Sequence, residues 1–181
     1  VCVHELSHAV TAYWEGDDTA KSLGYFTLNP MVHMGKESLI ILILFGLCWG
    51  ACPVNPSNFR HRYGDALVAA AGPFANLLLM ILFAFLLWTF HTTVPQGTID
   101  QSVYSNLITF LTLGSVVNAA LFLLNMIPIP PLDGHSVVAD LCPQTRGFYQ
   151  GLGAKGFIIL FVLFWLPIGF SEAFWGSAMV M

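Results

Sequence analysis

The stretch that decides the fold is Ala66–Phe90, ALVAAAGPFANLLLMILFAFLLWTF, which contains no charged residue. As a helix, its 25 residues would be about 37 Å long, enough to cross the roughly 30 Å hydrocarbon core of a bilayer with some tilt. Asn106–Ile127 is a second uncharged run, of 22 residues, and Phe157–Trp175 is a third apolar run, of 19 residues. Val1–Trp14 has the pattern of the last part of another apolar helix. These runs predict a bundle of about four spanning helices.

The composition of the whole chain agrees with a membrane protein. Of its 181 residues, 56% are apolar and 9% are charged, against about 45–50% and about 25% in soluble domains. A net charge of −4 with six Lys and Arg excludes a basic surface for nucleic acid. The four cysteines lack the spacing of a disulfide framework or a thiolate zinc site, so we expect small buried residues. We predict an all-α polytopic membrane protein, with residues 1–181 forming one domain whose first helix begins upstream.

The loops predict which side of the membrane faces the cytoplasm. Leu39–Ala51 is apolar but only 13 residues long, about 20 Å as a helix, so we expect it to re-enter the membrane or lie at its surface. Loops 15–65 and 128–156 then share one side and hold all six cations, and 91–105 lies opposite and holds none. The positive-inside rule assigns the cationic side to the cytoplasm. On that side, Ser22–Leu28 (SLGYFTL) predicts a short β-hairpin arm, which either pairs with an extended peptide or is a plain surface hairpin.

The strongest chemical signal is His4-Glu5-Leu6-Ser7-His8, an H-E-x-x-H motif in the first helical pattern. Histidines at positions i and i+4 project from one helix face and can bind one Zn²⁺ ion together. Glu5 stands beside the first ligand, within reach of a metal-bound water as its general base. The alternative is that other groups of the bundle satisfy these side chains. An ionisable cluster in an apolar helix is costly, however, which favours function.

A catalytic zinc site needs a third protein ligand and an open position for water. Asp133 is the best candidate, because the three prolines of NMIPIPPLDG at 125–134 end the preceding helix and present Asp133 on non-helical backbone. The alternative is that Asp133 caps a short helix that runs through Ser136–Leu141. Under the predicted topology the first helix runs toward the cationic side, and the run before Asp133 ends there. His4, His8 and Asp133 can therefore meet.

Taken with one further motif, these residues resemble the site-2 protease family of intramembrane zinc metalloproteases. The shared motifs, in the family's order within residues 1–141, are HELSHA at 4–9, AGPFAN at 71–76 and NMIPIPPLDG at 125–134. TLNP at 27–30 and PVNPSNFR at 53–60 are similar to the compact prokaryotic members. The resemblance implies three zinc ligands, one catalytic base and one residue that binds the substrate or the oxyanion: His4, His8 and Asp133; Glu5; and Asn125.

The resemblance also implies a function. The protein would be a zinc-dependent endopeptidase that cleaves membrane-anchored substrates, such as transmembrane or signal-peptide-like helices, within or near the bilayer by metal-activated water attack. It would be a multi-pass protein of a prokaryotic cell membrane, with its active site toward the cytoplasm. The alternative is a zinc-binding membrane protein without proteolysis, either an inactive relative or a metal transporter. Runs 66–90 and 106–127 contain no ionisable residue to relay an ion, which argues against transport.

The other polar residues have lesser predicted roles. Asn76 and Asn118 are expected to make helix–helix hydrogen bonds. His135 is expected to face solvent or to touch the site from outside the ligand set. A glutamate third ligand is a further alternative, but Glu172 lies near the opposite end of the last helix. Three more histidines are expected in loops without a metal: His33, His61 and His91.

Overall fold

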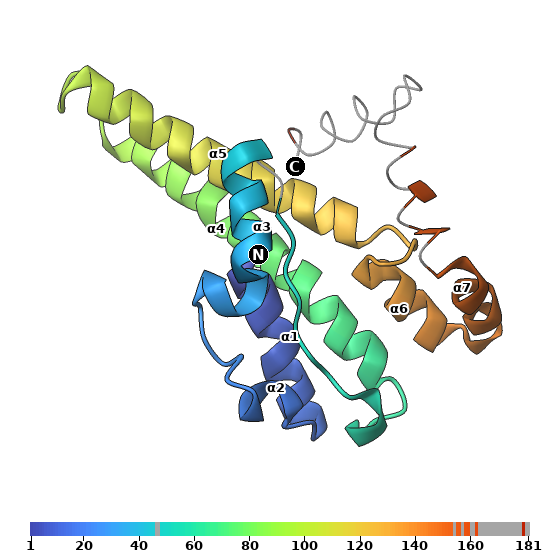
Figure 1. The fold of residues 1–181 in the computed structure, drawn as a ribbon. Coiled ribbons are helices and arrows are strands. Elements are labelled where there is room, and N and C mark those ends of the chain that lie inside the picture. Colours follow the sequence, from blue (N-terminus) through green and yellow to red (C-terminus); the bar gives the residue numbers. More distant parts are fainter. Residues whose placement is uncertain (46–47, 154, 157, 160–161, 163–178, 180–181) are drawn as a thin grey trace.

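The computed structural model describes residues 1–45, 48–153, 155–156, 158–159, 162 and 179, and in them it is all-helical, with no strand (Figure 1). Two short 3₁₀ helices, Pro56–Asn58 and Pro143–Thr145, lie in the connections. The α-helices in chain order are α1 Cys2–Glu15, α2 Thr19–Ser22, α3 Pro30–Phe45, α4 Gly64–Thr93, α5 Gln101–Asn125, α6 Asp133–Leu141 and α7 Arg146–Leu152.

Helices α4 and α5 form a long antiparallel hairpin (Figure 1). By length and composition, both could cross a membrane. Their contact is close because α5 has a glycine where α4 has a phenylalanine: a Cβ atom on Gly114 would lie 2.6 Å from the Phe83 ring. The buried core between them is Met80, Ala119 and Ala120. The hairpin therefore contains the buried apolar core of the described residues.

Helix α4 is also the centre of the bundle. Figure 1 shows α1 (blue) and α6 (orange) beside the N-terminal half of α4, and both helices contact it. The run of small residues before Pro73, Ala69 to Gly72, lets neighbouring helices approach this half closely. Residues from the start of the chain and from residue 133 onward therefore meet on the same helix.

A buried polar network fixes the end of α1. Gly16 ends the helix in the left-handed conformation, with φ of 105°. Asp17, which is fully buried, accepts hydrogen bonds from Asn55 N at 2.6 Å and from Asn58 Nδ2 at 2.9 Å. The backbone of Arg60 donates to Glu15 O at 2.8 Å. The extended segment that follows α3 is thus tied back along α1.

The predicted hairpin arm at Ser22–Leu28 is wrong. Helix α2 ends at Ser22, and the next N–H groups turn back toward it: Gly24 N donates to Lys21 O and Tyr25 N to Ala20 O. Gly24 has a φ of 83°, which a strand cannot contain. These local hydrogen bonds consume the donors that a β ladder would need.

Three further predictions concern element bounds. Within Leu39–Ala51, the described residues are helical through Phe45, the end of α3, and non-helical from 48 to 51, and α3 has non-helical backbone at Gly35. His33 and His91 lie in helices, α3 and α4, rather than in loops. The predicted span Phe157–Trp175 falls almost wholly outside the described residues.

Candidate metal centre

The first two candidate ligands come from α1. His4 and His8 are one turn apart and both are buried, so their rings share one face of the helix. The two Nε2 atoms are 3.1 Å apart, and the ring planes are nearly perpendicular. Two buried nitrogens of this kind, facing one another, are suited to share a cation.

Asp133 brings the third candidate ligand from the start of α6. Helix α6 begins at Asp133 with Leu132 as its N-cap residue and no side-chain cap, so Asp133 does not act as the helix cap. Its Oδ2 atom lies 3.1 Å from His4 Nε2 and 3.5 Å from His8 Nε2. Although this oxygen is buried and close to both rings, it accepts no well-aligned hydrogen bond. An orphaned buried carboxylate oxygen is unusual, and a metal ion would satisfy it.

The spacing of the three atoms fits zinc. Ligand atoms held about 2.0–2.1 Å from a tetrahedral zinc ion lie about 3.3–3.4 Å from one another. The three separations measured here are 3.1, 3.1 and 3.5 Å. Two imidazole nitrogens and one carboxylate oxygen also form a known zinc donor set. The group His4, His8 and Asp133 can therefore hold a metal ion.

A pocket of about 300 Å³ opens beside these ligands. Glu5, which is buried, and Asn125, which is half-buried, both line it. Asn125 Nδ2 donates to Leu121 O in its own helix at 3.0 Å. Three carboxylates, those of Glu5, Asp65 and Asp133, face the pocket, and no Lys or Arg is among its described lining residues. This charge balance favours a divalent cation.

Two titratable residues that line this pocket, Asp65 and Cys52, are not among the site residues predicted from the sequence. Asp65 sits in the first turn of α4, and Cys52 lies in the extended segment after α3. Cys52 is half-buried rather than buried, and Cys48 and Cys142 are exposed. Burial, reinforced by the carboxylates of Glu5 and Asp17, raises the pKa of the Cys52 thiol to about 12. Cys52 is not among the three residues whose ligand atoms converge.

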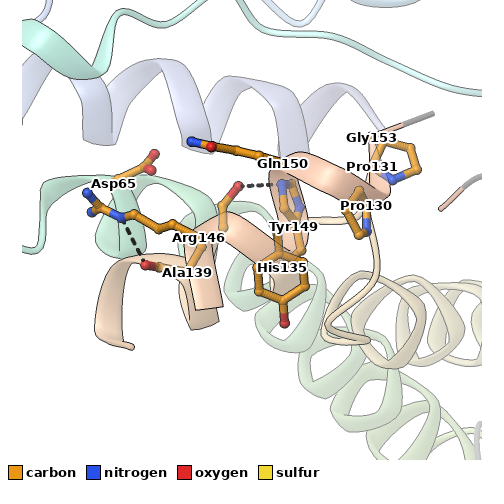
Figure 2. A pocket seen from close by; sticks show the side chains of 10 residues that line it. Asp65, Pro130, Pro131, His135, Ala139, Arg146, Tyr149, Gln150 and Gly153 are labelled. Carbon is orange, nitrogen blue, oxygen red and sulfur yellow. Dashed lines mark hydrogen bonds between the residues drawn. The ribbon is translucent and has the colours of Figure 1, made fainter. Parts of the chain in front are cut away.

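A larger cavity, of about 790 Å³, adjoins the metal pocket and shares Asp65, Pro131 and Ser136 with it. Figure 2 shows the side chains of this cavity, with Arg146 reaching across from α7 to the carbonyl of Ala139. His135 lies in this cavity and is not one of the ligands. The two cavities are therefore neighbours, and these three residues line both of them.

Comparison with known proteins places the chain in a family. Residues 1–103 and 90–166 match the model of peptidase family M50. YwhC of Bacillus subtilis, a predicted zinc metalloprotease, is 38% identical over 96% of this chain and 79% of its own length. Rip2 of Mycolicibacterium smegmatis and Rip2 of Mycobacterium tuberculosis, also predicted zinc metalloproteases, are each 32% identical over 92% of this chain and 64% of their own length.

No solved structure gave a significant match. The resemblance of the motifs to the site-2 proteases is confirmed by the match to this family. The chain therefore belongs to peptidase family M50, and its enzyme class is zinc metalloprotease.

Proposed function

We propose that this protein hydrolyses peptide bonds of membrane-anchored protein substrates, within or near the lipid bilayer. The observation that carries the proposal is the convergence of His4, His8 and Asp133 beside two helices long and apolar enough to span a membrane. Membership of a protease family implies a protein substrate. The two long apolar helices, α4 and α5, both of which contribute residues to the pocket, are what point to a substrate that is itself anchored in the membrane.

In this proposal His4 and His8, through Nε2, and Asp133, through its carboxylate, hold the zinc ion. Bound zinc supplies Lewis-acid chemistry, since it polarises a water molecule and the carbonyl group of the substrate. The pocket of about 300 Å³ beside the three ligands has room for that water and for a length of polypeptide.

Glu5 is the proposed general base. Its carboxylate lines the same pocket. The carboxylate also packs closely against Gly50, because a Cβ atom added there would lie 2.5 Å from Glu5 Oε1. Glu5 takes a proton from the attacking water and returns it to the nitrogen of the leaving amine. A buried carboxylate is suited to both tasks because little competing solvent reaches it.

Asn125 is proposed to steady the oxygen of the scissile carbonyl as negative charge develops on it. One N–H of its amide donates to Leu121 O, and the second remains to donate to the substrate. Asn125 also contributes to the pocket from the last turn of α5, opposite α1. The amide is thus anchored at one hydrogen and available at the other.

The membrane arrangement is part of the proposal. Residues 1–181 form one domain of about four spanning helices, with Leu39–Ala51 re-entrant and the cationic loops in the cytoplasm of a prokaryotic cell. The substrate is a transmembrane or signal-peptide-like helix. A helix in lipid hides its carbonyls in its own hydrogen bonds, so the substrate must unwind locally before Glu5 and Asn125 can act on it.

The test is cleavage of a membrane-anchored reporter by the purified chain in detergent or liposomes. Glu5→Gln should keep zinc bound and lose activity by at least about 100-fold, since it removes general acid–base catalysis alone. Asp133→Ala should lower the zinc content instead. Zinc binding by the wild-type chain without any cleavage would favour the alternative, a zinc-binding membrane protein or transporter. Retained cleavage by Glu5→Gln would exclude Glu5 as the base.

A further inference from the structure

One face of α4 forms the back wall of the metal centre. Val68, Gly72 and Asn76 recur at intervals of four residues, so they lie one above another on this face. A Cβ atom on Gly72 would lie 2.4 Å from His8 Nε2 and 2.6 Å from His4 Nε2. The two imidazole rings therefore rest directly against the backbone of α4, with Val68 on one side of Gly72 and Asn76 on the other.

Each ring has a partner on this face for its other nitrogen. His8 Nδ1 donates to Val68 O at 2.7 Å, which leaves Nε2 of His8 without a proton and free to bind a metal. The corresponding atom of His4, Nδ1, lies 3.2 Å from Nδ2 of the Asn76 side-chain amide. The backbone thus fixes one ring, and a side chain is in position to fix the other.

Asn76 is itself buried to 99%, and its amide contacts His4 in the apolar interior. A side-chain amide can present either its oxygen or its nitrogen after a half-turn about its last bond. When Nε2 of His4 binds a metal, the proton of that ring must sit on Nδ1, and the amide must then present its oxygen. A buried amide without such a bond would be costly.

We infer that Asn76 is a positioning residue of the metal centre, on the premise that His4 is a zinc ligand as proposed above. Its amide oxygen accepts the Nδ1 proton of His4, fixes the tautomer in which Nε2 is a ligand, and holds the plane of the ring. Asn76 thereby does for His4 what the Val68 carbonyl does for His8. Such partners of ligating histidines commonly change metal affinity about 10- to 100-fold.

A purely structural role for Asn76 makes a different prediction. If the amide only joined α4 to α1, then its loss would lower stability and leave zinc affinity unchanged. A carboxylate at this position would then be harmful, because it would bury a charge. If Asn76 instead positions a ligating histidine, a carboxylate at this position should work well, because carboxylates commonly accept the N–H of such histidines. Asn76→Asp therefore separates the two roles.

The experiment measures the zinc dissociation constant of the full chain in detergent, by competition with a chromophoric chelator and with zinc alone as the probe. Asn76→Ala should weaken zinc binding about 10- to 100-fold, and Asn76→Asp should restore it to within about threefold of the wild type. Asn118→Ala is the matched control, because among the described residues the Asn118 amide donates to Gly114 O in its own helix, at 2.8 Å, and this variant should bind zinc as the wild type does. Asn76→Leu, of similar volume, replaces the alanine variant should that one not fold.

Equal zinc affinity in the wild type and in a folded Asn76→Ala or Asn76→Leu variant would overturn this inference alone. Weak binding by Asn76→Asp together with Asn76→Ala would also overturn it, in favour of a structural role. A wild-type chain that binds no zinc would overturn the metal centre itself, and this inference with it.

Discussion

Gly72 is the residue at which a single methyl group decides whether the metal centre can form. Its Cα faces both candidate histidine ligands, and an alanine Cβ there would overlap both rings. Rings cannot retreat far in a packed interior, so we expect Gly72→Ala to displace the Nε2 atoms and to weaken zinc binding by more than about 10-fold. The strain should also lower stability by about 1–3 kcal/mol. Chelator competition and thermal unfolding in detergent measure the two effects.

Gly147→Ala is the control for that change. A Cβ atom on Gly147, in α7, would meet no atom of the described residues within 4 Å, so both zinc affinity and unfolding temperature should stay close to those of the wild type. Full zinc affinity in a folded Gly72→Ala variant would show that the two rings do not rest against Gly72 when zinc is bound.

A substitution at Gly50 should affect the proposed base, Glu5, without affecting the candidate metal ligands. An alanine there would contact the far end of the Glu5 side chain, which is flexible and can yield. We therefore expect Gly50→Ala to move the carboxylate, with zinc binding and stability nearly unchanged. A displacement of about 1 Å in a catalytic group costs on the order of 100-fold in rate. Reporter cleavage at saturating zinc measures this effect, and wild-type activity would show that Glu5 tolerates displacement or is not the base.

At the scale of elements, the joint between α1 and the segment after α3 depends on the charge of Asp17. Burial tends to raise the pKa of Asp17, but hydrogen bonds from Thr19, Asn55 and Asn58 outweigh it and lower the pKa. A carboxyl whose pKa is lower when folded stabilises the protein above its unfolded pKa of about 3.9. That contribution is lost as the pH falls through the folded pKa.

Asp17→Asn should therefore unfold more easily than the wild type at pH 7, because hydrogen bonds to a charged group contribute about 1.5–3 kcal/mol each. The difference between the two should shrink as the pH is lowered through about 4 and below. Thermal unfolding between pH 3 and pH 7 in one detergent measures it. A difference that stays constant over this range would mean that the charge of Asp17 does not support the joint.

The elements that could be predicted from the sequence are those whose signal is local. The uncharged run Ala66–Phe90 predicted α4 within three residues at each end, since a long apolar run without charges is a signal that the local sequence carries in full. Helix α5 starts five residues earlier than predicted, at Gln101, because Asp100 caps it by accepting from Ser102 N and Val103 N. Ser22–Leu28 failed because hydrogen bonds at a helix end, which periodicity does not report, took the place of a ladder.

The part of the candidate site that could be predicted from the sequence is the part that short motifs define. H-E-x-x-H predicted two candidate metal ligands one turn apart, and the proline-rich run indicated Asp133, whose Oδ2 atom lies 3.1 Å from His4 Nε2. The contact between Asn76 and His4 joins residues 72 positions apart. Asn76 was expected to make a helix–helix hydrogen bond, and it does, but its partner could not be named without the fold. Asn118 was expected to do the same and instead bonds within its own helix.

At the scale of the whole molecule, the metal centre lies at the end of α5 near residue 125, and the α4–α5 turn lies at the far end of the hairpin (Figure 1). The six cations of the chain are all on the segments at the metal-centre end, 15–65 and 128–156, whereas the 91–105 segment has none. Under the positive-inside rule, we expect the candidate metal centre to lie near the cytoplasmic face and the turn to lie outside.

Cysteine labelling in intact cells tests this orientation. The native cysteines are first replaced by alanine, and one cysteine is then introduced, as Gln96→Cys or as Ser57→Cys. Position 96 is in the exposed α4–α5 turn, and position 57 is in the exposed segment that is tied to α1. A membrane-impermeant maleimide should label position 96 in intact cells and position 57 only after the cells are opened. Both side chains are exposed, so a difference in labelling reports sidedness rather than burial. The reverse labelling pattern would place the candidate metal centre near the outer face of the membrane. Substrates would then approach it from outside the cell.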